Sequence, residues 1–211
     1  MAASRGALSR MSLDQPFRIR QYPLETGALE IQFLEEFFGE FDRKKSAMEI
    51  RERLEGREHG IFMVEASLPE EPTRFAPVSY RVAHEIRNEE TDPELADLVE
   101  RLREAVRFSG QRVLYAWLGG TRSDWRGQGH FRALDEFQEE WAIDKGFREI
   151  VVKTKNRYYE MRSTLTHLHF DVVKYEPHPI HNGDSKVYLS KRLGGAMRRP
   201  RRASLARYLE V

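Results

Sequence analysis

The segment from Val113 to Phe131 constrains the fold of this chain more than any other part of it. An apolar run over 113–118 ends in two glycines, and after a short polar turn the sequence Arg-Gly-Gln-Gly at 126–129 opens a helical pattern. A helix start leaves several backbone N–H groups without intrahelical partners, and the positive end of the helix dipole points the same way. The sequence therefore predicts a strand, a glycine-rich turn and a helix that together form an anion-binding site.

This turn resembles the acyl-CoA-binding motif of the GNAT-type N-acyltransferase superfamily, in which Gln or Arg is followed by two variable residues, Gly, one variable residue, and Gly or Ala. The nearest match runs from Arg126 to Phe131, and Phe131 stands where glycine or alanine is usual. A predicted strand at 149–153 and Asn156 before a further helical run fit the same family. The blocks 117–120 and 153–156 also resemble a poorly characterised bacterial branch, and the resemblance covers about 78–193.

The resemblance implies that acyl-CoA, with acetyl-CoA the expected form, lies where two neighbouring parallel strands separate, one ending near Gly120 and the other at 149–153. Backbone N–H groups from Gln128 to Phe131 would hold the pyrophosphate, and a backbone N–H at 119–121 would polarise the thioester carbonyl. The alternative is a strand-to-helix turn that binds no ligand. The implied cofactor-binding residues are Gly119, Gly120, Thr121, Arg126, Gly127, Gln128, Gly129, His130, Phe131 and Asn156.

The sequence supports the residues that would transfer protons less strongly than those that would bind the cofactor. Many GNAT enzymes carry a tyrosine on the helix after the asparagine, but the corresponding position here falls near Leu165. Tyr159, like Tyr158, lies earlier on the same predicted helix and is a candidate catalytic residue, with packing as the alternative.

Four residues are candidates for the general base: His84, Glu85, His130 and Glu136. Glu85 is preferred, because it lies at the outer end of a strand that would border the acceptor site, and an acid also occurs there in the related branch. Such a carboxylate could take the amine proton directly or through water. A solvated glutamate at a strand end is the alternative. The imidazole of His130 is expected to contact cofactor or solvent.

The length of 211 residues suits one domain. We expect a flexible leader at 1–15, the acyltransferase domain at 16–193 and a basic tail at 194–211. Helical spacing predicts a helix around 34–41 and a helical insertion at about 88–110. The apolar face of the insertion must cover either the core of its own domain or a partner subunit, which makes a homodimer a possibility.

Composition limits the other functions. The 35 basic and 34 acidic residues nearly balance, which argues against a dedicated nucleic-acid binder, although the basic run at 198–202 could touch one. The absence of cysteine excludes disulfides, thiolate metal sites and a cysteine nucleophile, and the histidine spacing does not suggest a metal site. No apolar run approaches the roughly 20 residues that span a bilayer, and no secretory signal is evident. A cytoplasmic protein with no membrane partner is expected.

The sequence thus predicts an α/β protein of GNAT-like architecture. Its mixed, mostly antiparallel sheet would have six or seven strands, a V-shaped opening between two of them, and helices on both faces. The predicted function is acyl-CoA-dependent N-acyltransfer to the primary amine of a small molecule or peptide, by direct attack in a ternary complex. The alternative is a non-catalytic module that binds acyl-CoA or a protein partner.

Overall fold

A computed structural model describes residues 17–24 and 45–194. It contains a seven-stranded sheet in the order β1-β2-β3-β4-β5-β7-β6, in which only β4 and β5 are parallel neighbours. The predicted leader, the predicted helix around 34–41 and the basic tail lie outside the described residues. The strands are β1 (Phe17–Tyr22), β2 (His59–Ser67), β3 (Phe75–Ile86), β4 (Arg112–Thr121), β5 (Phe147–Lys155), β6 (Asp171–Glu176) and β7 (Lys186–Arg192).

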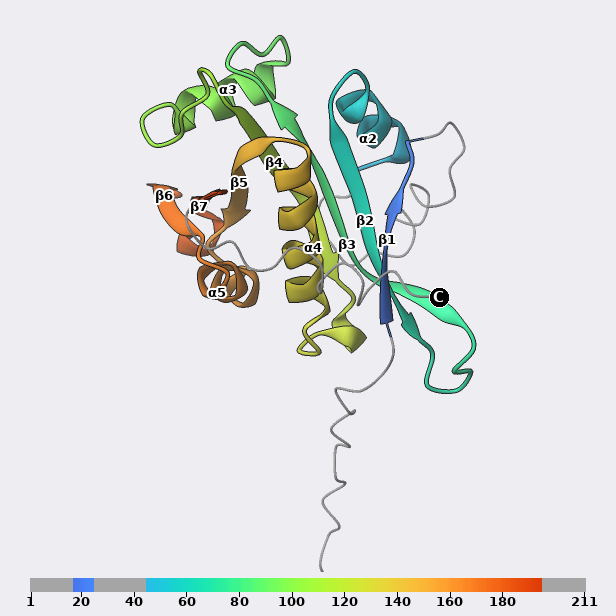
Figure 1. Ribbon diagram of the computed structural model, residues 1–211. Coiled ribbons are helices and arrows are strands. Elements are labelled where there is room, and N and C mark those ends of the chain that lie inside the picture. The colour runs from blue at the N-terminus through green and yellow to red at the C-terminus, as the bar shows by residue number, and fades with distance from the viewer. Residues whose placement is uncertain (1–16, 25–44, 195–211) are drawn as a thin grey trace, which may run out of the picture.

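The described helices cover both faces of the sheet, as predicted (Figure 1). Helices α4 (His130–Asp144) and α5 (Tyr159–His167) pack on one face, called here the α4 face. Helices α2 (Ala47–Leu54) and α3 (Pro93–Leu102) pack on the other, called the α3 face. Two short 3-10 turns, η1 (Ser123–Trp125) and η2 (Asn182–Asp184), follow β4 and precede β7. None of the described helices has both the length and the apolar character needed to cross a bilayer.

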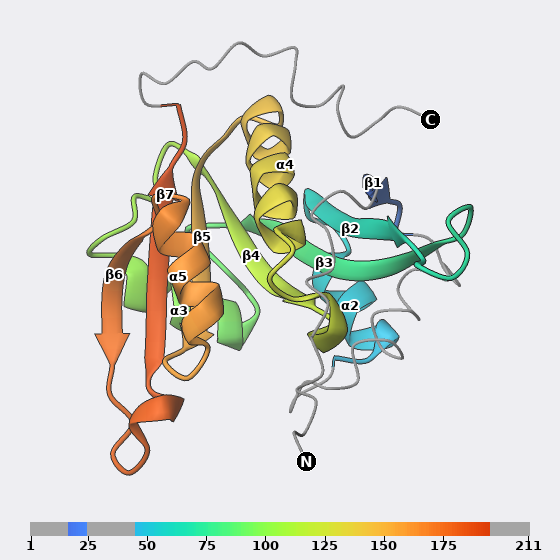
Figure 2. The same ribbon diagram turned by 90° about the horizontal axis from the view of Figure 1, so that it is seen from below.

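Strands β4 and β5 separate after a short paired stretch. Residues 112–115 of β4 pair with 147–151 of β5, and both strands then continue without pairing to each other, to Thr121 and Lys155. The two ribbons diverge beyond this point (Figure 2). This is the predicted V-shaped opening, and we call it the gap.

A β-bulge lies in β4 beside the gap. Val82 of β3 pairs with Leu118 and Ala83 pairs with Ala116, so Trp117 is the extra residue. Trp117 and Leu118 both pack against the apolar cluster on the α3 face. A bulge of this kind interrupts the alternation of side chains between the two faces of a strand.

Helix α3 lies within the segment predicted to be an insertion, and it packs against the sheet of the same chain. The Asp92 side chain accepts a hydrogen bond from the Leu95 N–H at 3.0 Å, and Pro93 opens the first turn. Burying each leucine on its apolar side contributes roughly 1.5–3 kcal/mol. The apolar side therefore needs no partner subunit, and the homodimer stays a prediction without this support. Buried together under α3 are Leu95, Leu98, Val99, Leu102, Val113, Tyr115, Val151 and Tyr188.

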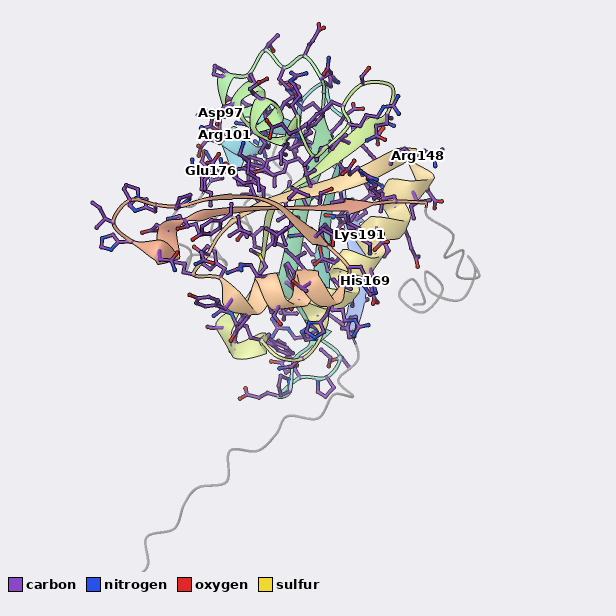
Figure 3. All side chains as sticks on the ribbon, turned by 90° about the vertical axis from the view of Figure 1, so that its left-hand side faces the viewer. Asp97, Arg101, Arg148, His169, Glu176 and Lys191 are labelled. Carbon is purple, nitrogen blue, oxygen red and sulfur yellow. The ribbon has the colours of Figure 1, made fainter. Side chains whose placement is uncertain are left out.

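An ion-pair network fastens α3 to the edge strand β6. Arg101 Nε lies 2.7 Å from Asp97 Oδ2, and the same guanidinium pairs with Glu176. The three side chains lie close together at the junction of the two elements (Figure 3). In addition, Lys174 Nζ donates to the Arg101 carbonyl at 3.0 Å. These contacts hold α3 against the β6 edge of the sheet.

Candidate functional site

The glycine-rich turn presents an open main chain at the start of α4. Gly127 and Gly129 have φ values of +77° and +81°, a conformation that favours glycine, and a Cβ at either position would meet nothing within 4 Å. None of the described side chains caps this helix, whose first bond runs from the Ala133 N–H to the Gly129 carbonyl. The N–H groups of the first turn therefore lack intrahelical acceptors and can receive an anion.

The end of β4 directs further N–H groups into the gap. The Arg122 N–H donates to the Val78 carbonyl at 3.0 Å, on the β3 side. Because N–H directions alternate along a strand, the N–H groups of Thr121 and Gly119 point away from β3, toward the gap. Arg126 Nε donates to the Thr121 carbonyl at 3.1 Å, which holds this side chain beside the turn. The geometry brings together the residues predicted at 119–121 and 126–131.

A buried ion pair connects helix α4, which follows the turn, to β3, the neighbour of β4, and sequence reasoning missed it. Arg81 on β3 and Asp135 on α4 are 2% and 4% exposed, and Nη2 of the former lies 2.6 Å from Oδ1 of the latter. Burial raises the pKa of Asp135 to about 6, and the positive charge of Arg81 opposes this rise. The available signal was Arg81 itself, the one charged residue in the stretch 78–83 of a predicted strand.

The position of Arg81 explains why residue 119 is a glycine and why residue 131 is a phenylalanine. A Cβ on Gly119 would lie 2.9 Å from Arg81 Cδ and 3.0 Å from Nη1, so the glycine makes room for the buried arginine. The Phe131 ring lies 5.0 Å from the guanidinium carbon on the same face. The unusual aromatic residue in the turn motif thus packs against Arg81.

Two buried polar side chains lack hydrogen-bond partners within the described part of the chain. Thr154 Oγ1, on the end of β5 that no longer pairs with β4, is buried without a hydrogen-bond partner among the described residues, and so are both amide atoms of Gln138 on α4. An unsatisfied buried polar group costs about 1–3 kcal/mol. With the open N–H groups of the turn and of β4, these atoms fit a ligand that carries amides and a diphosphate, as coenzyme A does.

Asn156 lies at the end of β5, as predicted, but its amide is engaged elsewhere. Its Nδ2 donates to the Asn182 carbonyl at 3.2 Å, and its Oδ1 accepts from Arg162. The Asn156 N–H donates to the Ser185 carbonyl at 2.8 Å. The residue ties β5 to the β6–β7 loop, and its contact with a cofactor stays a prediction.

His130 requires a correction. Its side chain is only 3% exposed, and its ring centroid lies 5.2 Å from that of Phe17 and 5.8 Å from that of Trp125. Burial lowers the pKa of the imidazole. The expectation that this ring contacts solvent is wrong, because the ring packs in the core, and its contact with a cofactor stays a prediction. Its main-chain N–H remains available to the turn.

The structure does not bring Glu85 to the bulge. Glu85 pairs with Leu114, before the gap opens, and shares the α4 face with Ala83, whereas the bulge side chains project from the other face. Glu85 Oε1 accepts from Arg112 Nε at 2.8 Å. This contact is typical of a structural ion pair.

Tyr159 also lies apart from the bulge. It is the first residue of α5, is 64% exposed, and its ring centroid lies 5.8 Å from the Arg162 guanidinium carbon. Leu165, at the position of the family tyrosine, is completely buried. The catalytic roles predicted for Glu85 and Tyr159 stay predictions.

His84, another candidate base, does lie beside the bulge on the α3 face. Its ring centroid is 5.6 Å from that of Tyr115 and 5.7 Å from that of Trp117. Nδ1 lies 2.9 Å from the Glu85 carbonyl oxygen, so it carries the proton, and Nε2 is buried without a partner among the described residues. Burial lowers the pKa of His84 to about 4, helped by the charges of Arg57 and Arg53. The imidazole is therefore neutral near pH 7.

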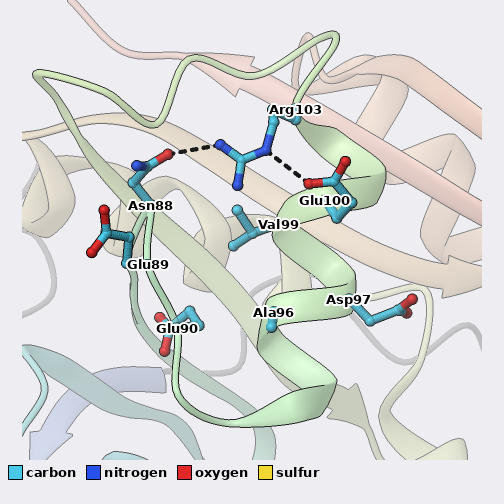
Figure 4. A pocket seen from close by; sticks show the side chains of 8 residues that line it. All are labelled: Asn88, Glu89, Glu90, Ala96, Asp97, Val99, Glu100 and Arg103. Carbon is cyan, nitrogen blue, oxygen red and sulfur yellow. Dashed lines mark hydrogen bonds and ion pairs between the residues drawn. The ribbon is translucent and has the colours of Figure 1, made fainter.

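A hollow of about 550 Å³ lies outside this site, between α3 and the loop before it (Figure 4). Most of the residues that line it are polar or charged, and Arg103 donates across it to Asn88 at 3.0 Å and to Glu100 at 2.9 Å. Glu90 beneath is bound by Arg57 through two contacts of 2.7 Å. Within the described part of the chain, no three His, Asp or Glu side chains gather in a way that could hold a metal ion.

Comparison with solved structures finds the same fold in known acetyltransferases. Arabidopsis thaliana NAA60 in complex with acetyl-CoA is 13% identical, covers 85% of this chain and all of its own, and superposes with a TM-score of 0.62. A GCN5-related N-acetyltransferase from Kribbella flavida is 16% identical, with coverage of 84% and 98% and a TM-score of 0.56. The ribosomal-protein-S18-alanine N-acetyltransferase from Escherichia coli is 12% identical, with coverage of 86% and 96% and a TM-score of 0.57.

At such identities the likeness is one of fold. No protein-family model and no curated protein matches the sequence. The chain has the GNAT fold, as predicted from its turn motif. The bacterial branch that the sequence resembles stays a prediction.

Proposed function

We propose that this chain is an acyl-CoA-dependent N-acyltransferase that uses acetyl-CoA and acts on a primary amine by direct attack in a ternary complex. One observation carries the proposal: β4 leaves β5 beside the open turn, so that the N–H groups of 119, 121 and the start of α4 face one continuous site. When bound there, the cofactor supplies an activated acyl thioester. The GNAT fold supports the proposal.

Each part of the site has a role in binding or polarisation. The main chain at 127–131 holds the diphosphate, and Arg126 adds positive charge beside it. The Gly119 N–H donates to the thioester carbonyl, and one such donor contributes about 3 kcal/mol to a transition state. Thr154 Oγ1 supplies a hydrogen-bonding group to the amide-bearing arm of the cofactor.

The acceptor reaches the carbonyl from the α3 face, where Trp117 and Leu118 project from the bulge. It enters as a neutral amine, and water takes its proton, because Glu85 is paired with Arg112 on the opposite face. Arabidopsis thaliana NAA60 has been crystallised with a bisubstrate analogue, and the enzyme from Escherichia coli is named for the alanine of a ribosomal protein. For the present chain we keep both acceptors predicted from the sequence, the amine of a small molecule and that of a peptide.

Calorimetric titration with acetyl-CoA tests the proposal. Gly127→Val combined with Gly129→Val should abolish binding, because the side chains enter the space that the diphosphate needs. Gly110→Val is a matched control: its φ is +77°, a Cβ there meets nothing within 4 Å, and it lies at the other end of β4. The control should lose similar stability and keep its affinity. Equal affinity in all three proteins would overturn the assignment of the turn.

A second candidate function is a non-catalytic acyl-CoA-binding or protein-interaction module. It is favoured by the completely buried Leu165, which leaves no proton donor at the family position. A screen for CoA release with a broad panel of amines separates the two. Binding of acetyl-CoA without release in the presence of any amine would support the module and contradict the enzyme.

A further inference from the structure

Lys153 of β5 stands across the gap from the bulge residue Trp117. Tyr115 and Val151 form the last pair between β4 and β5, and Trp117 and Lys153 each follow two residues later on strands that run in the same direction. Tyr115 and Val151 both pack in the cluster under α3. Because side chains alternate along a strand, Lys153 also projects from the α3 face. It is half-buried there.

The carboxylates around Lys153 are bound by other cations. Asp97 lies 2.7 Å from Arg101, and Glu94 lies 3.0 Å from Arg53. Within the described residues, the side chain of Lys153 makes no hydrogen bond and no ion pair. Its amine is therefore not held by a neighbouring acid.

The surroundings also favour the neutral amine. Burial lowers the pKa of Lys153, and the charges of Lys186 and Arg101 act in the same direction. Asp97 and Glu94 oppose the shift without reversing it. A neutral amine is the form that can attack a carbonyl.

We propose that Lys153 is an acyl acceptor within the protein itself, so that the chain acylates this lysine when no external amine occupies the α3 face. The inference rests on the proposed function. The lone pair of the neutral Lys153 Nζ attacks the acyl carbonyl carbon, an amide C–N bond forms and the thioester C–S bond breaks. One N–H proton passes through water to the departing sulfur, giving an acylated lysine and the free thiol of coenzyme A. The modification leaves this side chain unable to take up a proton, and the acyl group fills the acceptor face.

Peptide mass spectrometry after incubation with acetyl-CoA tests the modification. Lys153 should carry at least about tenfold more acetyl than Lys155, because a positioned amine reacts far faster than a free one. Lys155 is a matched control, two residues further along β5 and also half-buried, but paired with Asp184 at 2.7 Å. The Gly127→Val/Gly129→Val protein should lose this excess. Equal acetylation of both lysines, or an excess that survives in the glycine variant, would overturn the proposal.

The position of the Lys153 amine can also be tested without an acyl donor, by its chemical reactivity. Trace labelling with an amine-reactive reagent should modify Lys153 in the free protein, and saturating coenzyme A should protect it about fivefold or more while Lys186 keeps its reactivity. Labelling of Lys153 that coenzyme A leaves unchanged would contradict its position beside the thiol. Calorimetry distinguishes a failure of the proposed function from a failure of the Lys153 proposal. If acetyl-CoA does not bind, both are overturned; if it binds but Lys153 is not modified, only the Lys153 proposal is overturned.

Discussion

Asp135 Oδ1 lies 2.6 Å from Arg81 Nη2, and this buried contact joins α4, the helix after the glycine-rich turn, to β3, the strand beside β4. The Arg81 side chain packs against Gly119, whose N–H faces the gap, and the Phe131 ring packs against its guanidinium. The pair therefore fixes the distance between the group that would hold a diphosphate and the group that would polarise a carbonyl.

Removing one partner of the pair should be costly. Arg81→Met or Asp135→Leu alone should lower the free energy of unfolding by about 3–5 kcal/mol, because each leaves an uncompensated buried charge. The double variant Arg81→Met/Asp135→Leu should recover most of this loss. Urea unfolding of the four proteins gives the coupling energy directly. Losses that simply add in a double variant would show that the two side chains do not interact.

Gly119→Ala tests the close approach of Arg81 to β4. The new methyl group would lie 2.9 Å from Arg81 Cδ, and overpacking of this kind costs about 1–3 kcal/mol. The cost should shrink in the Arg81→Met/Asp135→Leu background, as unfolding curves in urea will show. Gly183→Ala is the control, because a Cβ there meets only Arg157 Cβ, at 3.4 Å. The same cost in both backgrounds would mean that something other than Arg81 excludes the methyl group.

Some of this architecture was predictable from the sequence and some was not, for physical reasons. The strand, turn and helix at 113–131 follow local rules of apolar spacing and glycine conformation, and all three were predicted. The burial of Arg81 and Asp135 depends on residues 54 positions apart in the sequence, and charged side chains are rarely buried. Periodicity likewise showed that the 88–110 helix has an apolar face, but not that its own sheet covers it.

The face of a strand on which a residue lies is equally hard to read when the strand contains a bulge. Simple alternation from Tyr115 would place Leu118 on the α4 face, but the extra residue Trp117 returns it to the α3 face. Glu85 shows a related difficulty. A sequence indicates that a carboxylate ends a strand, but not which face it leaves from or that Arg112 will bind it.

Thr154→Val should separate stability from cofactor affinity. The substitution keeps the shape of the side chain and removes an unpaired buried hydroxyl, so the free protein should gain up to about 1 kcal/mol. Affinity for coenzyme A should fall about tenfold if that hydroxyl pairs with the cofactor. Thermal unfolding and calorimetry measure the two effects. Thr121→Val is the control: it removes a 2.8 Å contact with Ser79 and should therefore lose stability. If Thr154→Val binds coenzyme A as tightly as the parent, Thr154 is not part of the cofactor site.

Glu85→Gln and Tyr159→Phe test the two predicted catalytic side chains. From their positions we expect each variant to keep its turnover within about threefold of the original, whereas loss of a general acid or base typically costs a hundredfold or more, about 10²–10⁴. Steady-state CoA release with the best acceptor found in the amine screen gives the comparison. A hundredfold loss in either variant would restore that residue to proton transfer and require a conformation in which it reaches the gap.

The buried imidazole of His84 should make stability depend on pH. Burial lowers its pKa in the folded chain to about 4, whereas the ordinary value is 6.5. Between these two values the unfolded chain binds a proton that the folded chain does not, so the free energy of unfolding falls as the pH falls through this window. The full effect approaches about 3 kcal/mol, at 1.36 kcal/mol for each unit of pKa. His84→Asn keeps a donor for the Glu85 carbonyl and cannot titrate, so unfolding curves at several pH values should show a smaller loss below pH 6.5 than the parent. All other titrating groups are common to both proteins. If the free energy of unfolding falls with pH equally in both, the pKa of His84 is the same in the folded and the unfolded chain.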